Sequence, residues 1–106
     1  MTDLNSVFFA LGDETRRAIL GELKDGEKPL SVLAQPFDMS QTAVTRHVRV
    51  LEDAGLVTIE KRGRVRHCAL TAGPMGDVTS WLEDYRPFWA DRLDALEKAV
   101  RESADE

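Results

Sequence analysis

Hydroxyl and basic side chains recur on one side of a helix predicted over residues 41–54. At 3.6 residues per turn, three apolar residues of this segment share one face: Val44, Val48 and Leu51. The opposite face carries Thr42, Arg46, Arg49 and Asp53, and the two flanks carry Thr45 and His47. Such a helix buries its apolar stripe and leaves a polar, largely basic face exposed.

A second group of cations lies shortly after this helix. Residues 61–64 form a predicted turn with one glycine and three cations, and Arg66 follows on the next strand. Residues 40–68 therefore hold six basic and three acidic side chains, whereas the whole chain of 106 residues has a net charge of −5. Because charges act locally, a basic island can bind a polyanion even within an acidic protein.

The sequence lacks the residue patterns that catalysis or metal binding requires. The sequence contains no glycine loop that cradles phosphate and no nucleophile elbow. Carboxylates such as Glu83 and Asp84 fit a solvated helix face. A tetrahedral metal site takes about four ligands, but the chain offers one cysteine and two histidines. We therefore expect no enzyme, no metal site and no cofactor.

The single cysteine, Cys68, lies beside His67 and could form a redox-tuned thiol. Side chains alternate between the two faces of a strand, so Cys68 shares a face with Arg64, Arg66 and Leu70. This position instead indicates that Cys68 is a small side chain that packs on the strand. No second cysteine is present to resolve an oxidised thiol, so we favour the packing role.

Apolar spacing and capping residues predict the elements that position these side chains. The expected helices are residues 4–11, a segment from the Asp13 cap to about Lys24, a short segment from Val32 to Gln35 capped by Ser31, residues 41–54 capped by Ser40, and a long helix over 77–101. The expected strands are residues 56–60 and 65–70. Pro87 should kink or split the last helix, because proline lacks the backbone donor.

This order of elements predicts a winged helix-turn-helix. We expect a mainly α protein of five helices with a two-stranded β-wing, forming a single domain over residues 1–106. Residues 4–71 would be the core DNA-binding region, and residues 77–101 a C-terminal dimerisation helix. An α-helix fits the major groove of duplex DNA, and a basic hairpin can neutralise phosphates on the backbone or in the minor groove.

Two runs of the sequence resemble the ArsR-type winged-helix repressors: Leu11–Leu20 is similar to their opening signature, and Ser40–Val57 to their recognition helix. Gly63 and Arg64, with Arg66, match their wing. Residues 81–96 resemble the last helix of a non-metal-sensing subgroup. The resemblance implies a homodimeric, sequence-specific DNA-binding regulator, usually a repressor, that binds an operator with an imperfect inverted repeat.

The resemblance also assigns site residues. The family's DNA contacts fall on Gln41, Thr42, Thr45, Arg46 and His47, with Arg62, Arg64 and Arg66 in the wing. The helical wheel adds Arg49, and the basic turn adds Lys61. In the family the first and last helices form the dimer interface, which here would include Val7, Phe8, Trp81, Tyr85, Phe88, Trp89, Leu93 and Leu96. The cysteines of the family's thiolate metal site would align near Pro29, Ser31 and Ala34, and none is present.

Several side chains keep two interpretations. His47 can bond a phosphate or orient neighbouring side chains, since imidazole both donates and accepts. Arg16 and Arg17 can contact phosphate or pair with Glu52, Asp53 or the acidic tail. The aromatic row of residues 81–89 fits a dimer interface better than a small ligand pocket near Pro87, and no pattern assigns an effector.

The alternative function is a winged-helix module that binds a protein partner and has no DNA function. The acidic tail and the aromatic row support it, but such a module has no need of an aligned basic face. No apolar run reaches the roughly 18–20 residues that span a bilayer, and residues 1–5 lack the basic start of a signal peptide. With one cysteine, a reducing cytoplasm is the expected compartment and no membrane partner is expected.

Overall fold

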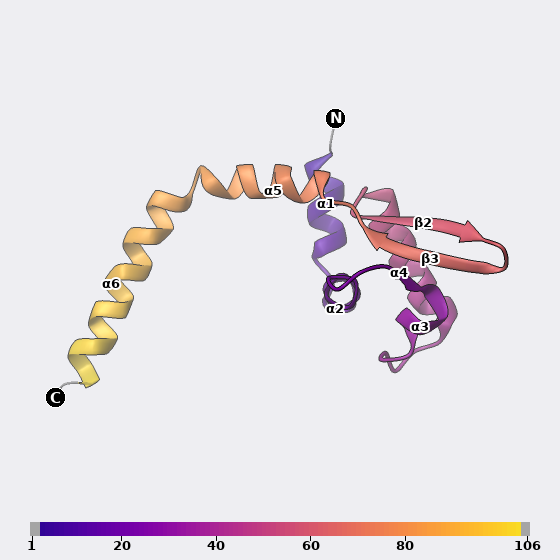
Figure 1. Ribbon diagram of the computed structural model, residues 1–106. Coiled ribbons are helices and arrows are strands. Elements are labelled where there is room, and N and C mark those ends of the chain that lie inside the picture. The colour runs from indigo at the N-terminus through magenta and orange to yellow at the C-terminus, as the bar shows by residue number, and fades with distance from the viewer. Residues whose placement is uncertain (1–2, 105–106) are drawn as a thin grey trace.

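The computed structural model of the chain describes residues 3–104. Its helices are α1 (Leu4–Leu11), α2 (Glu14–Glu22), α3 (Leu30–Ala34), α4 (Gln41–Asp53), α5 (Gly73–Glu83) and α6 (Arg86–Ala104). Its strands are β1 (Lys28–Pro29), β2 (Val57–Arg62) and β3 (Val65–Leu70). The result is a mostly helical, winged-helix-like fold with a small antiparallel sheet (Figure 1).

Both ends of α4 are fixed by local chemistry. The Ser40 hydroxyl accepts a hydrogen bond from the Ala43 N–H at 3.1 Å, which satisfies one of the free donors of the first turn. At the other end Gly55 takes a φ of 80°, which side-chain-bearing residues rarely adopt. The Gly55 N–H then donates to the Glu52 carbonyl and the Leu56 N–H to the Leu51 carbonyl. This Schellman arrangement ends the helix and turns the chain into β2.

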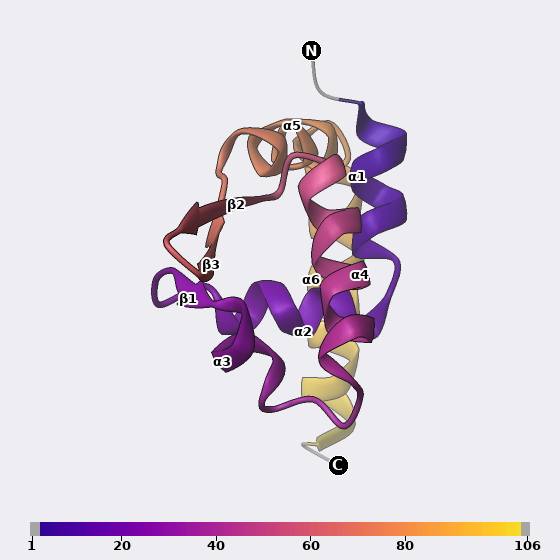
Figure 2. The same ribbon diagram turned by 90° about the vertical axis from the view of Figure 1, so that its right-hand side faces the viewer.

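The sheet has the order β1-β3-β2, and every pairing is antiparallel. In the β2–β3 hairpin Val57 pairs with Leu70 at the base and Arg62 pairs with Val65 at the tip. Gly63, with a φ of 64°, makes the tight turn possible. The tip of the hairpin therefore extends beyond the core as a wing (Figures 1 and 2).

The core lies between α4 and the elements around it. α1 and α2 contribute Val7, Ala10 and Ile19, and α4 contributes the expected stripe of Val44, Val48 and Leu51. Leu33 of α3 and the Cys68 side chain of β3 are also completely buried. Because α4 packs against this core with its apolar face, its polar face points outward beside the wing.

The C-terminal helices leave this core. α5 contacts α1 and buries Val78, but α6 has no buried residue and extends away from the rest of the chain (Figure 1). The radius of gyration is 18.2 Å, compared with about 13 Å for an ordinary domain of 100 residues. The extended α6 accounts for this shape.

The structure corrects several predicted elements. Over residues 3–104 there are six helices rather than five, because the helix expected over 77–101 is split into α5 and α6. Pro87, the second residue of α6, stands where its missing donor is tolerated. The helix expected to end near Lys24 ends at Glu22, and α3 begins at Leu30 after Pro29, so Ser31 is not its cap.

The sheet also differs from the prediction. It has three strands among the described residues, since β1 pairs with β3 as well. Lys61 and Arg62, expected in the turn, extend β2 by pairing with Arg66 and Val65 of β3. β2 is therefore longer than the strand expected over 56–60 and begins one residue later, while the hairpin spans the predicted wing of residues 57–70.

Candidate nucleic-acid interface

The exposed face of α4 carries most of the side chains predicted to contact DNA. Gln41, Thr42, Arg46 and Arg49 are exposed, while Thr45 and His47 on the flanks are half-buried. The Thr45 hydroxyl donates to the Gln41 carbonyl at 2.8 Å, which holds its rotamer. The Arg49 Nη1 lies 3.8 Å from the Glu52 carboxylate on the same helix, so part of its charge is balanced locally.

α4 and the wing meet at a shared surface hollow. The hollow has a volume of about 450 Å³ and is lined by Leu30, Ser31, Gln41, Thr45, Lys61, Arg64, Val65 and Arg66. It brings together residues predicted separately from the helix and from the hairpin: Gln41, Thr45, Lys61, Arg64 and Arg66. Three cations border it, so it suits a polyanion that touches the helix and the wing at once.

Arg62 of the wing has a different environment from the cations of the hollow. Its guanidinium donates a hydrogen bond to the Glu27 carboxylate, and its Nε lies 3.8 Å from Glu60. The hydrogen bond from Arg62 lowers the pKa of the Glu27 carboxyl, and the same contact raises the pKa of Arg62. The His67 Nδ1 is also 3.8 Å from Glu27. Arg62 therefore ties the wing to the loop before β1, a contact that the sequence did not reveal.

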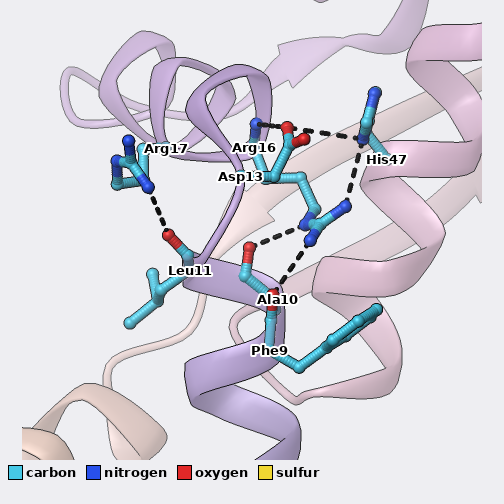
Figure 3. Close-up of polar contacts among 7 residues, drawn as sticks. All are labelled: Phe9, Ala10, Leu11, Asp13, Arg16, Arg17 and His47. Atoms are coloured by element: carbon cyan, nitrogen blue, oxygen red, sulfur yellow. Dashed lines mark hydrogen bonds and ion pairs between the residues drawn. The ribbon is translucent and has the colours of Figure 1, made fainter.

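His47 lies on the flank of α4 that faces α2. Its Nδ1 is 3.4 Å from the Arg16 Nη1 and 3.8 Å from the Asp13 carboxylate (Figure 3). Asp13 caps α2 by accepting from the Arg16 N–H at 3.0 Å. This backbone hydrogen bond is the main cause of the lowered pKa of Asp13, and the nearby Arg16 and His47 charges lower it further.

Arg16 and Arg17 have structural partners other than those considered from the sequence. Arg16 donates to the Ala10 and Phe9 carbonyls at 2.7 and 2.9 Å, and Arg17 donates to the Leu11 carbonyl at 2.7 Å (Figure 3). These three carbonyls lie in the last turn of α1, where helical partners are missing. Among residues 3–104, neither arginine therefore pairs with Glu52, Asp53 or the acidic tail, which was one of the two interpretations.

Cys68 is completely buried in the core. Burial raises the pKa of its thiol, and the negative charge of Glu52 raises it further. Both effects oppose the thiolate that redox chemistry needs, in agreement with the packing role. Within residues 3–104 no three histidine, cysteine or carboxylate side chains are grouped so as to hold a metal ion.

The residues predicted to form a dimer interface divide into two groups. Val7 is completely buried in the core, so it has no surface to offer a partner. The others are exposed: Phe8, Trp81, Tyr85, Phe88, Trp89, Leu93 and Leu96. The Phe8 and Trp81 rings lie 5.5 Å apart, and Trp81 and Tyr85 lie 4.8 Å apart, so α1 and α5 share one aromatic surface. None of the described helices is long and apolar enough to cross a bilayer.

The fold and this surface define a winged helix-turn-helix protein, and comparisons with known proteins agree. Residues 11–60 match the family described as a helix-turn-helix domain. The chain is 38% identical over 87 residues to the uncharacterised HTH-type transcriptional regulator YuzN of Bacillus subtilis, with 74% of this chain and 95% of that protein covered. It is 28% identical over 82 residues to the transcriptional repressor SdpR of Bacillus subtilis, with 77% and 91% covered.

A solved structure described as an ArsR family transcriptional regulator superposes with a TM-score of 0.76 and 44% identity, covering 82% of this chain and 96% of that one. The chain therefore belongs to the ArsR family of transcriptional regulators. Members of this family are DNA-binding regulators rather than enzymes, which favours DNA over the protein-binding module as the function of the basic face.

Proposed function

We propose that this regulator is a homodimeric repressor that inserts α4 into the major groove of its operator. The hollow shared by α4 and the wing carries this proposal, because Gln41, Thr45 and three cations border one concave surface. An α-helix of about 10–12 Å diameter fits a major groove about 12 Å wide. The similarity to a protein named as a repressor, SdpR, supports repression. Because the proposed target is a promoter, we also propose that the protein acts in the cytoplasm.

The two parts of the surface have different tasks. Arg46 and Thr42 project from the exposed face of α4, where they can reach base edges. Lys61, Arg64 and Arg66 border the hollow from the wing side and neutralise phosphates on the backbone or in the minor groove. Arg62 contributes less to DNA than these three, because Glu27 and Glu60 already balance its charge.

A second copy of the chain would cover the exposed apolar residues of α6. Trp89, Leu93, Leu96 and Val100 recur at spacings of four, three and four, which places them on one stripe of the helix. All four are more than half exposed. A twofold dimer would also place two α4 helices about 34 Å apart, matching an imperfect inverted repeat.

A fluorescence-anisotropy titration tests the DNA-binding mode. The probe is a labelled duplex of about 30 base pairs from upstream of the protein's own gene, compared with a scrambled duplex at two salt concentrations. We expect Lys61→Ala to weaken binding and lower its salt dependence, whereas Lys98→Ala on α6 changes neither. Equal effects of both lysines would contradict the proposed surface. If the protein bound neither duplex at either salt concentration, the protein-binding module would be favoured instead.

Sedimentation velocity tests the dimer. Leu93→Asp places a charge in the apolar stripe of α6 and should convert the dimer to a monomer, because an unpaired charge is costly to bury. Ala95→Asp adds the same charge outside the stripe, and we expect the dimer to persist. A wild-type protein that sediments as a monomer at micromolar concentration would contradict this part of the proposal.

A further inference from the structure

One guanidinium connects three helices beside the proposed DNA surface. Arg16 belongs to α2, and its Nε and Nη2 donate to the Ala10 and Phe9 carbonyls at the end of α1. The guanidinium carbon also lies 5.1 Å from the centre of the Phe9 ring. These contacts fix the position of the group and leave its remaining nitrogen, Nη1, directed at His47 of α4 (Figure 3).

The contact between Arg16 and His47 favours one tautomer of the imidazole. A guanidinium has only donors, so the 3.4 Å contact is a hydrogen bond only where the His47 Nδ1 accepts from Nη1. The neutral ring then carries its proton on Nε2. The Asp13 carboxylate is 3.8 Å from Nδ1, beyond hydrogen-bond distance, so Arg16 is the nearer partner of this nitrogen.

The other ring nitrogen of His47 points away from both Arg16 and Asp13 (Figure 3). We propose that Arg16 is a positioning residue for DNA binding, which fixes the Nε2–H form of His47 so that this N–H donates to a phosphate beside α4. The inference rests on the proposed function. It assigns His47 the phosphate contact, and it reverses the interpretation in which His47 orients its neighbours, since here Arg16 orients the ring.

Arg17 provides a matched control for Arg16. It is the next residue of α2, carries the same charge, and also donates to a carbonyl of the last turn of α1, that of Leu11. This partner lies on α1 and not on α4. Arg16→Gln and Arg17→Gln therefore remove the same charge and a contact with the end of α1. Arg16→Gln also removes a second carbonyl contact, the contact with the Phe9 ring and the contact with His47, and the His47→Gln background separates the last of these from the others.

The first arm of the test is a ¹⁵N NMR measurement of the His47 ring on the protein without DNA, at about pH 8.5, where imidazole is neutral. We expect the Nε2–H form in the wild type and in Arg17→Gln, and a mixture of the two forms in Arg16→Gln. A wild-type ring with its proton on Nδ1 would overturn the inference. This arm is independent of DNA, so it does not depend on the proposed function.

The second arm measures affinity for a scrambled duplex at low salt, because a phosphate contact does not require the operator sequence. Arg16→Gln should weaken binding about fivefold to tenfold, and Arg17→Gln should have a smaller effect. In His47→Gln the amide nitrogen replaces Nε2 without needing the tautomer, so adding Arg16→Gln to that variant should cost less than about twofold. An equal loss in both backgrounds would overturn the positioning role. Wild-type protein that binds no duplex would instead defeat the proposed function.

Discussion

α4 and α6 are both amphipathic helices, but only the apolar stripe of α4 is covered by its own chain. Val44, Val48 and Leu51 of α4 are completely buried. α6 has no buried residue, and Leu93, Leu96 and Val100 are each about 60% exposed. An apolar stripe thus predicts a helix and a buried face, whereas the tertiary structure determines whether that face is covered by the same chain or by a partner.

The largest expected effect is on stability, and it distinguishes the buried apolar stripe of α4 from the exposed stripe of α6. Leu51→Ala should lower the free energy of unfolding by about 3 kcal/mol, because it leaves a cavity in a closed core. Leu96→Ala removes the same atoms from a helix with no intrachain cover, so its loss should depend on protein concentration, as dimer dissociation does. Urea denaturation at several protein concentrations measures both variants. A concentration-independent loss of similar size for Leu96→Ala would contradict the comparison.

The next effect concerns sequence specificity on α4. Arg46→Ala should weaken operator binding by about 1–3 kcal/mol and reduce the preference for the operator over a scrambled duplex. Arg101 of α6 has a local partner, Glu97, and Arg101→Ala should leave the preference unchanged. Competition anisotropy with both duplexes measures this ratio. A uniform loss on both duplexes for Arg46→Ala would make it a phosphate contact rather than a base contact.

A smaller effect separates two arginines of the wing. Arg64 borders the hollow, so Arg64→Ala should lower the slope of log affinity against log salt by about 0.9 for each bound chain, or about 1.8 for the dimer. Arg62 is balanced by Glu27, so Arg62→Ala should change the slope less. Titrations at four or more salt concentrations give both slopes, and a larger change for Arg62→Ala would reverse the assignment.

The smallest expected effect is the pH dependence of the contact between Glu27 and Arg62. The pKa of Glu27 is lowered in the folded protein. Its contribution to stability is therefore present above its ordinary pKa and is lost as pH falls through the lowered value. Glu27→Gln should be less stable than the wild type near neutral pH and equally stable in acid. Denaturation curves across this range test the point, and a difference that does not vary with pH would contradict it.

Local signals made part of this structure predictable. Ser40 and Gly55 fixed the ends of α4 to within a residue, because both act through hydrogen bonds to the adjacent turn. The side chains of its exposed face followed from the helical period. Pro87 indicated the interruption of the last helix, although the sequence left open whether it would kink or split.

The missed features depend on contacts between distant residues or on very short elements. Arg62 and Glu27 are 35 residues apart, and Arg16 and His47 are 31 apart, so no local period connects them. β1 has two residues, too few to show alternation, and one of them is Pro29. α5 starts at Gly73, earlier than expected, because Pro74 is tolerated in a first helical turn.

The central claim is that two copies of the chain bind one operator through their α4 helices. Sedimentation equilibrium of the wild-type protein with the upstream duplex measures this directly, because each bound chain adds 11.9 kDa to the complex. We expect two chains on each duplex at saturation, and a lower fraction of bound duplex for Arg46→Ala at the lowest protein concentration that saturates the wild type. One chain on each duplex, or a complex unaffected by Arg46→Ala, would contradict the claim.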